Sequence, residues 1–176
     1  MDFSKIDDLF SREIIRGGES YLDGMLRIAT SADQRASGLA GMFTAAATAL
    51  LAAVVALANP AWSVTGKLPL LLGGATASLM FLIGAVTCLS TIMPVKFWLP
   101  GCEPHNWDED VAAGKKLHDC LGERATHIQE QIADNLGVIE KNARRFKWGA
   151  RFGIAAPFVG VVVWLLASAC RFSAGL

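Results

Sequence analysis

Two uncharged stretches decide the fold: Ser37–Ala58 reads SGLAGMFTAAATALLAAVVALA, and Leu68–Met93 reads LPLLLGGATASLMFLIGAVTCLSTIM. They contain 22 and 26 residues without an acidic or basic side chain. A helix needs about 20 apolar residues to cross a hydrocarbon core of about 30 Å. Lipid offers the backbone no hydrogen-bond partner, so each stretch must be helical throughout. Because the loop Asn59–Lys67 is too short for a domain, the pattern predicts a transmembrane hairpin within residues 36–93.

A third apolar segment, residues 148–170, predicts another transmembrane helix. Its uncharged part, Phe152–Cys170, has 19 residues, and the neighbouring Arg151 lies near enough to the end for its guanidinium to reach the interface. The hydrophobic fraction of 53% and the mean hydropathy of +0.40 agree with a membrane protein. The predicted fold class is therefore all-α, an integral membrane protein with three transmembrane helices and a cytoplasmic helical bundle from the N-terminal helix and residues 108–147.

The N-terminal segment, residues 1–35, has the periodicity of an amphipathic helix. It carries twelve charged side chains, which excludes a cleavable signal peptide, and Gly17–Gly18 is a place where the helix is expected to kink or break. Its polar face mixes acidic residues with arginine, which favours packing on another helix over lying on the membrane surface. The expected apolar face consists of Phe3, Ile6, Phe10, Ile14, Leu22, Met25, Ile28 or Ala29, and Ala32.

Residues 94–147 follow the hairpin and combine a linker with a coiled-coil-like helical region. The linker, 94–107, is rich in proline; its tryptophans Trp98 and Trp107, like Trp62 in the hairpin loop, suggest contact with the membrane interface. An unbroken helix over 108–146 would be about 58 Å long, whereas the linker spans at most about 48 Å. We therefore expect a break at Gly114 or Gly122, or else a strongly tilted helix. The apolar seam comprises Leu117, Leu121, Ala125, Ile128, Ile132, Leu136, Ile139, Ala143 and Phe146.

Basic residues near the predicted span ends indicate the orientation, because they favour the cytoplasmic side. The external side carries Lys67 and Arg171. The N-terminus and residues 94–147 are therefore predicted to be cytoplasmic, and the C-terminal tail, residues 171–176, periplasmic. The basic residues on the cytoplasmic side are Arg27, Arg35, Lys96, Lys141, Arg144, Arg145, Lys147 and Arg151.

Small residues recur along the hairpin at spacings that let helix backbones approach closely in lipid. The pattern does not distinguish packing within one chain from packing between subunits of a homo-oligomer. The predicted helix-packing residues are Gly38, Gly41, Ala45, Ala49, Ala52 and Ala56 in the first span, with Gly73, Gly74 and Gly84 in the second.

Few chemistries fit the sequence. It has no phosphate-binding glycine loop, nucleophile elbow or His-Glu-x-x-His motif, so no enzyme is predicted. The spans contain no ionised residue apart from Arg151 at an edge, which argues against a selective transporter. The residue types and spacing of Cys102, His105, His118 and Cys120 resemble those of a zinc site. Residues 118 and 120 point to nearly opposite faces of a helix, however, so no metal is predicted. The cysteines are expected to be free thiols.

Binding of a small anionic ligand by the cytoplasmic region is not excluded by the sequence. Lys115, Lys116 and Arg124 are candidates to bind phosphate, and Trp107 or Trp98 could stack on a base. The alternative is a solvated basic face without a ligand.

The residues before the first span, Ser31–Ser37 (SADQRAS), resemble the Ala-Asp-x-Lys-Ala motif of the Pycsar-type transmembrane effectors of bacterial phage defence, with Arg35 in place of lysine. Ile128–Ile132 (IQEQI), continuing through Arg144 to Trp148, resembles the C-terminal helix of that family. The layout is also similar to the SLATT effectors. The tract 98–107 departs from the family pattern.

The resemblance implies an oligomeric effector of the bacterial inner membrane that acts in antiviral defence. Its cytoplasmic helices would sense a cyclic nucleotide or a partner, and its spans would then impair the membrane. Asp33 and Arg35 would be the hinge between the two parts. Neither an organic cofactor nor a nucleic acid is implied. The alternative function is a structural or accessory scaffold that binds a partner through the cytoplasmic helices.

Overall fold

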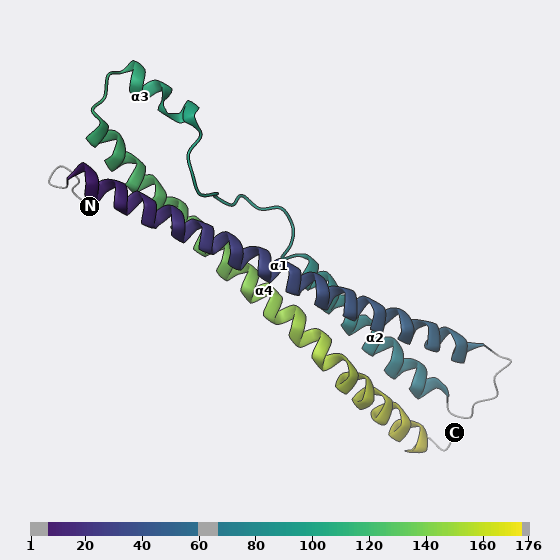
Figure 1. Cartoon of the computed structure of the whole chain (residues 1–176). Helices are drawn as coiled ribbons and strands as arrows, with labels where there is room; N and C mark the ends of the chain where they lie inside the picture. Colours follow the sequence, from purple (N-terminus) through teal and green to yellow (C-terminus); the bar gives the residue numbers. More distant parts are fainter. Residues whose placement is uncertain (1–6, 60–66, 174–176) are drawn as a thin grey trace. The chain divides into compact units, whose positions relative to one another are not determined.

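The computed structural model describes residues 7–59 and 67–173, and all regular structure in this part of the chain is helical. Three helices, α1, α2 and α4, are long and apolar enough to span a membrane. The predicted all-α class with three candidate spans is thus confirmed. In chain order the elements are α1 (Asp8–Ala58), α2 (Lys67–Leu89), the 3₁₀ helix η2 (Pro104–Trp107), α3 (Asp108–Ala112) and α4 (Leu117–Ser173) (Figure 1).

The chain divides into two compact units. Unit 1 takes residues 1–32 and 94–141, and unit 2 takes residues 33–93 and 142–176. Helices α1 and α4 each contribute residues to both units, whereas α2 belongs to unit 2 and η2 and α3 to unit 1.

Helix α1 continues through Gly17 and Gly18, so the helix does not break there. A glycine inside a helix costs about 1 kcal/mol relative to alanine, but tertiary packing offsets this cost at Gly18. A Cβ at that position would lie only 2.6 Å from Ile128 Cγ2, so the close contact with α4 requires a glycine.

The core of unit 1 is formed where α1 contacts α4, by Leu22, Met25 and Ile128. The buried face of α1 includes Leu22 and Met25 of the expected face, and Ala29 rather than the alternative Ile28 is half-buried, but Phe10 is 60% exposed. The expected positions Phe3 and Ile6 lie outside the described residues. Two neighbouring stripes of this helix carry apolar residues, and periodicity alone does not select between them. Side chains that pack around this core are Ile15, Phe97, Ile132 and Ile139.

Most of the predicted seam on α4 is buried or packs against a core, and the exceptions are Leu117, Leu136 and Ala143. Ala125 is buried, but Leu117 and Leu136 are 46% and 41% exposed. The buried positions beyond Ile128 include Asn135, which is fully buried. A straight helix drifts by about 20° per heptad relative to a 3.5-residue repeat, so single positions of a seam drawn over nine residues, such as Leu136, turn away from the packed face.

The expected break before the long helix lies at Gly114, one of the two predicted positions. Helix α3 ends at Ala112, and Gly114 has a φ of +64°, which L-residues with side chains rarely adopt. Helix α4 starts at Leu117 and passes through the other candidate, Gly122, without interruption.

The core of unit 2 depends on glycines that allow large groups or backbones to approach. The ring of Phe43 occupies the space that a side chain at Gly153 would need. A Cβ on Gly84 would lie 3.0 Å from both Gly149 O and Gly153 N, so α2 and α4 are in near backbone contact. Gly73 and Gly74 are equally confined, with Gly160 O and Val54 Cγ2 each 2.7 Å from the position of a Cβ.

The small-residue stripe predicted on α1 does not pack inside the chain. A Cβ at Gly38 or Gly41 would have nothing within 4 Å, and the alanines of the stripe are exposed. Packing between subunits stays a prediction. The exposed alanines are Ala45, Ala49, Ala52 and Ala56, whereas the buried residues on this part of α1 are Ala36, Ala40, Phe43 and Ala47.

The ends of the spans differ in detail from the predicted bounds. Helix α2 ends at Leu89 rather than Met93, and Thr91 Oγ1 donates to Cys88 O at 2.7 Å in the turn that follows. Helix α4 continues from unit 1 into the third apolar segment, where the Arg151 guanidinium lies 5.1 Å from the Trp148 ring centre. The suggested interface contact of Trp62 lies outside the described residues.

Candidate ligand-binding site

Lys115 lies directly after the break at Gly114 and forms two ion pairs. Its Nζ is 2.8 Å from Asp110 Oδ1 and 2.9 Å from Glu123 Oε2. The hydrogen bonds with Asp110 and then with Glu123 raise the pKa of Lys115 above its usual value. The ammonium therefore joins α3 to α4 and is neutralised by carboxylates of unit 1.

Arg124 is the second engaged cation. Its side chain is only 9% exposed, and its Nη2 donates to Glu19 Oε1 of α1 at 3.3 Å. The same nitrogen donates to the carbonyl oxygen of Gly101 in the linker. One guanidinium thus connects three segments of unit 1, which makes Arg124 partly structural.

A cavity of about 380 Å³ brings two of the predicted ligand residues together, Trp107 and Arg124. This volume lies within the range of about 300–1,000 Å³ found for small-molecule sites. Neither Lys115 nor the exposed Lys116 lines this cavity, but Lys115 is paired with two residues that do, Asp110 and Glu123. The lining residues are Cys102, Asn106, Trp107, Asp110, Cys120, Glu123, Arg124 and His127.

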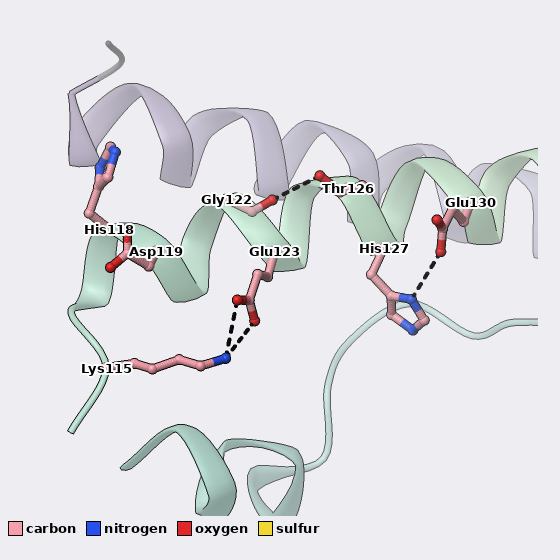
Figure 2. A pocket seen from close by; sticks show the side chains of 8 residues that line it. All are labelled: Lys115, His118, Asp119, Gly122, Glu123, Thr126, His127 and Glu130. Carbon is pink, nitrogen blue, oxygen red and sulfur yellow. Dashed lines mark hydrogen bonds and ion pairs between the residues drawn. The ribbon is translucent and has the colours of Figure 1, made fainter. Parts of the chain in front are cut away.

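A wider groove of about 770 Å³ runs along the same part of α4 (Figure 2). Figure 2 shows Lys115 directed at both oxygens of Glu123, and His127 directed at Glu130, with 3.6 Å between Nδ1 and Oε2. The lining carries three carboxylates against one lysine, so the groove does not favour phosphate as long as Lys115 is paired with Glu123. The lining residues are Lys115, His118, Asp119, Gly122, Glu123, Thr126, His127 and Glu130.

Trp98 fixes the linker to α4 near the cavity of about 380 Å³. Its backbone N–H donates to Asn135 Oδ1, and its carbonyl oxygen accepts from Asn135 Nδ2, both at 2.9 Å. The indole Nε1 donates to Asp134 Oδ2 at 3.0 Å, and Lys96 Nζ lies 3.9 Å from the ring centre. Trp98 is therefore held by helix α4 rather than free to stack on a ligand.

The residues weighed for zinc have separate partners. His105 Nδ1 is 2.8 Å from Asp108 Oδ2, and His118 Nδ1 is 3.1 Å from Asp8 Oδ1. Within residues 7–59 and 67–173, no group of three or more potential ligands is arranged to hold a metal ion. Cys102 is a half-buried free thiol.

The proposed hinge residues, Asp33 and Arg35, lie inside the unbroken helix α1. The division between the two units falls between Ala32 and Asp33, within the stretch Ser31–Ser37. Asp33 is half-buried and Arg35 is exposed.

Three residues of the site were not singled out from the sequence: Asp110, Glu123 and Asn135. Asp110 and Glu123 are separated by 13 positions and a helix break, so no fixed spacing links them to Lys115. Asn135 could have been identified from the sequence, because an asparagine next to a predicted apolar seam usually needs a hydrogen-bond partner.

Comparison with protein-family models, curated proteins and solved structures finds no match for this chain.

Proposed function

We propose that the protein is an oligomeric effector of the bacterial inner membrane that acts in antiviral defence. Unit 1 lies in the cytoplasm and binds a nucleotide signal, and the three spans then impair the membrane. The observation that supports this most directly is the continuity of α4 from Leu117 to Ser173. Its first turns line the cavity with Arg124 and His127, and its last 19 uncharged residues are apolar enough to cross a bilayer.

In this proposal the ligand binds by exchanging partners. A phosphate competes with Asp110 and Glu123 for the ammonium of Lys115, since both offer charge-assisted hydrogen bonds. Trp107 supplies an aromatic face for the base. Release of Asp110 frees α3 from the start of α4 and shifts the balance between two states of unit 1. The ligand acts only by its difference in affinity for these states.

The orientation follows from the basic residues. Arg151 lies above the ring of Trp148 near the start of the third apolar segment. Such a pair of a cationic and an aromatic side chain suits a membrane interface. With this end cytoplasmic, the N-terminus lies in the cytoplasm and the C-terminus in the periplasm.

Induced expression of the full chain in bacteria tests the function. Entry of a membrane-impermeant dye is followed with and without phage infection. We expect dye entry to increase with infection in cells that make the wild-type protein, and to stay at the uninduced level with Lys115→Met. Lys116→Met is the matched control, because it removes an adjacent lysine that lines neither the cavity nor the groove, whereas Lys115 is paired with Asp110 and Glu123 of the cavity lining.

The scaffold alternative predicts a different result. Dye entry and growth would remain unchanged in every condition, and a stable partner would copurify with the protein in detergent. That combination would overturn the effector proposal.

A further inference from the structure

Two thiols from distant parts of unit 1 line the same cavity. Cys102 lies in the linker before η2, Cys120 lies in the first turns of α4, and both contribute to the lining of the cavity of about 380 Å³. We propose that Cys102 and Cys120 form a disulfide across this cavity when the protein meets a hydroperoxide. This is the cavity that the proposed function assigns to the nucleotide, but the disulfide does not rest on that assignment.

The placement of Cys102 is set by its neighbour. Arg124 Nη2 donates to Gly101 O, which holds the linker against α4. Cys120 precedes Arg124 by four residues, so the two side chains lie on one face of the helix, a turn apart. The guanidinium therefore anchors the linker beside the turn that carries Cys120.

The segment that carries Cys102 has freedom to close the remaining space. A disulfide requires Cα atoms about 4.4–6.8 Å apart. Residues 101–107 form only bends and a single 3₁₀ turn, in which Asn106 N donates to Glu103 O at 3.0 Å, and contribute no residue to the hydrophobic core. Segments with few core contacts open and shift at low free-energy cost. The cavity supplies the room into which the Cys102 sulfur can move.

The two thiols have different environments, which assigns their roles. Cys102 is half-buried, and Asn106 Nδ2 lies 3.5 Å from its sulfur, where the amide can donate to a thiolate. Cys120 is buried, and burial is the main cause that raises its pKa. Cys102 is therefore the thiol that meets the oxidant, and Cys120 is the thiol that resolves the product.

The reaction is balanced with hydrogen peroxide as the oxidant. The Cys102 thiol releases its proton to solvent and the thiolate attacks one peroxide oxygen. The O–O bond breaks, Cys102 becomes a sulfenic acid, and the departing hydroxide takes up a proton from solvent and leaves as one water. The Cys120 sulfur then attacks Cys102 Sγ, loses its proton, and expels the sulfenic oxygen as a second water. Two thiols lose two electrons and two protons, and one peroxide becomes two waters.

Peptide mapping of the wild-type protein provides the test. The full chain in detergent is treated with hydrogen peroxide, remaining thiols are alkylated, and trypsin is used without reductant. Trypsin separates Cys102, in Phe97–Lys115, from Cys120, in Leu117–Arg124. We expect these two peptides to be joined in one species, whose mass is that of the two peptides less two hydrogen atoms. Dithiothreitol should separate this species into the two peptides.

Variants distinguish this disulfide from other oxidation products. Cys170→Ala should leave the cross-linked species unchanged, whereas Cys102→Ala should abolish it. Wild-type protein in which Cys102 ends as a sulfinic acid, pairs with Cys170, or joins two chains, without the link to Cys120, would overturn the proposal. Because the decisive species is sought in unmutated protein, a folding defect of a variant does not affect the conclusion.

Discussion

Asn135 uses both ends of its side-chain amide to hold the backbone of Trp98. The Oδ1 atom accepts from the Trp98 N–H and the Nδ2 atom donates to the Trp98 carbonyl, each at 2.9 Å, and Asn135 is fully buried. The linker that leaves α2 is thus bonded to α4 across 37 positions of sequence. This pair determines where the linker runs before it reaches the cavity.

Replacing Asn135 by alanine should release the linker. Two part-buried backbone groups would lose their partners, at a cost of up to about 1–3 kcal/mol for each unsatisfied group. Hydrogen exchange of the Trp98 amide should therefore accelerate by about tenfold or more, since about 1.4 kcal/mol corresponds to a factor of ten. Trp98→Phe is the control, because it removes only the exposed indole bond to Asp134 and should change the exchange little. Unchanged exchange in Asn135→Ala would refute this account.

The glycines of unit 2 should respond unequally to the same substitution. Gly84→Ala places a Cβ 3.0 Å from two backbone atoms of α4, so α2 and α4 must separate. Overpacking of this kind costs about 1–3 kcal/mol. Gly41→Ala meets nothing within 4 Å of the chain and should be neutral or stabilising. Thermal unfolding in detergent should show a lower transition temperature for Gly84→Ala alone. A loss of the oligomer in Gly41→Ala would instead indicate a contact between subunits.

Ser78 makes a hydrogen bond between two candidate spans. Its Oγ donates to Ala47 O of α1 at 2.9 Å, and Ser78 is fully buried. We expect Ser78→Ala to destabilise the protein by about 0.6 kcal/mol, the average found for such bonds within membranes. Thr76→Ala is the matched control, because its hydroxyl donates to Leu72 O of its own helix. Equal changes in unfolding free energy for the two variants would contradict a specific bond between α1 and α2.

Cysteine alkylation should report the raised pKa of Cys120. Burial, the largest cause, disfavours the thiolate, so a smaller fraction of Cys120 is reactive at a given pH. Iodoacetamide should modify Cys120 more slowly than Cys102 at pH 8, with the rate rising only above the usual thiol range. Since the pKa is raised in the folded state, the contribution to stability is complete below the unfolded-state value of about 8.5 and is lost as the pH rises from there through the folded-state value. Faster alkylation of Cys120 than of Cys102 would contradict its burial.

The sequence predicted the spans because membrane helices need long apolar runs, a requirement independent of tertiary contacts. It did not predict which face of α1 is buried in unit 2. Between Ser37 and Ala58 alanines occupy every face, and the choice depends on Phe43, whose ring fills the space above Gly153 of another helix. Such a contact has no local signature.

The sequence likewise predicted only part of the candidate ligand-binding site. Trp107 and Arg124 were selected by residue type, and they do share a cavity. The ion pairs of Lys115 could not be derived, because they depend on the turn at Gly114 that brings Asp110 and Glu123 to the same ammonium. Helical periodicity describes each helix separately and says little about a linker that returns to pack on it.

The most direct test of the central claim is leakage from lipid vesicles that contain the purified full-length protein. A fluorescent dye is enclosed, and cyclic mononucleotides and cyclic dinucleotides are added one at a time. We predict that at least one nucleotide accelerates dye release on the order of tenfold, a common size of ligand coupling, and that Lys115→Met abolishes the response while Lys116→Met retains it. No release with any nucleotide, or the same release from wild type and Lys115→Met, would contradict a nucleotide-responsive effector that acts through this cavity.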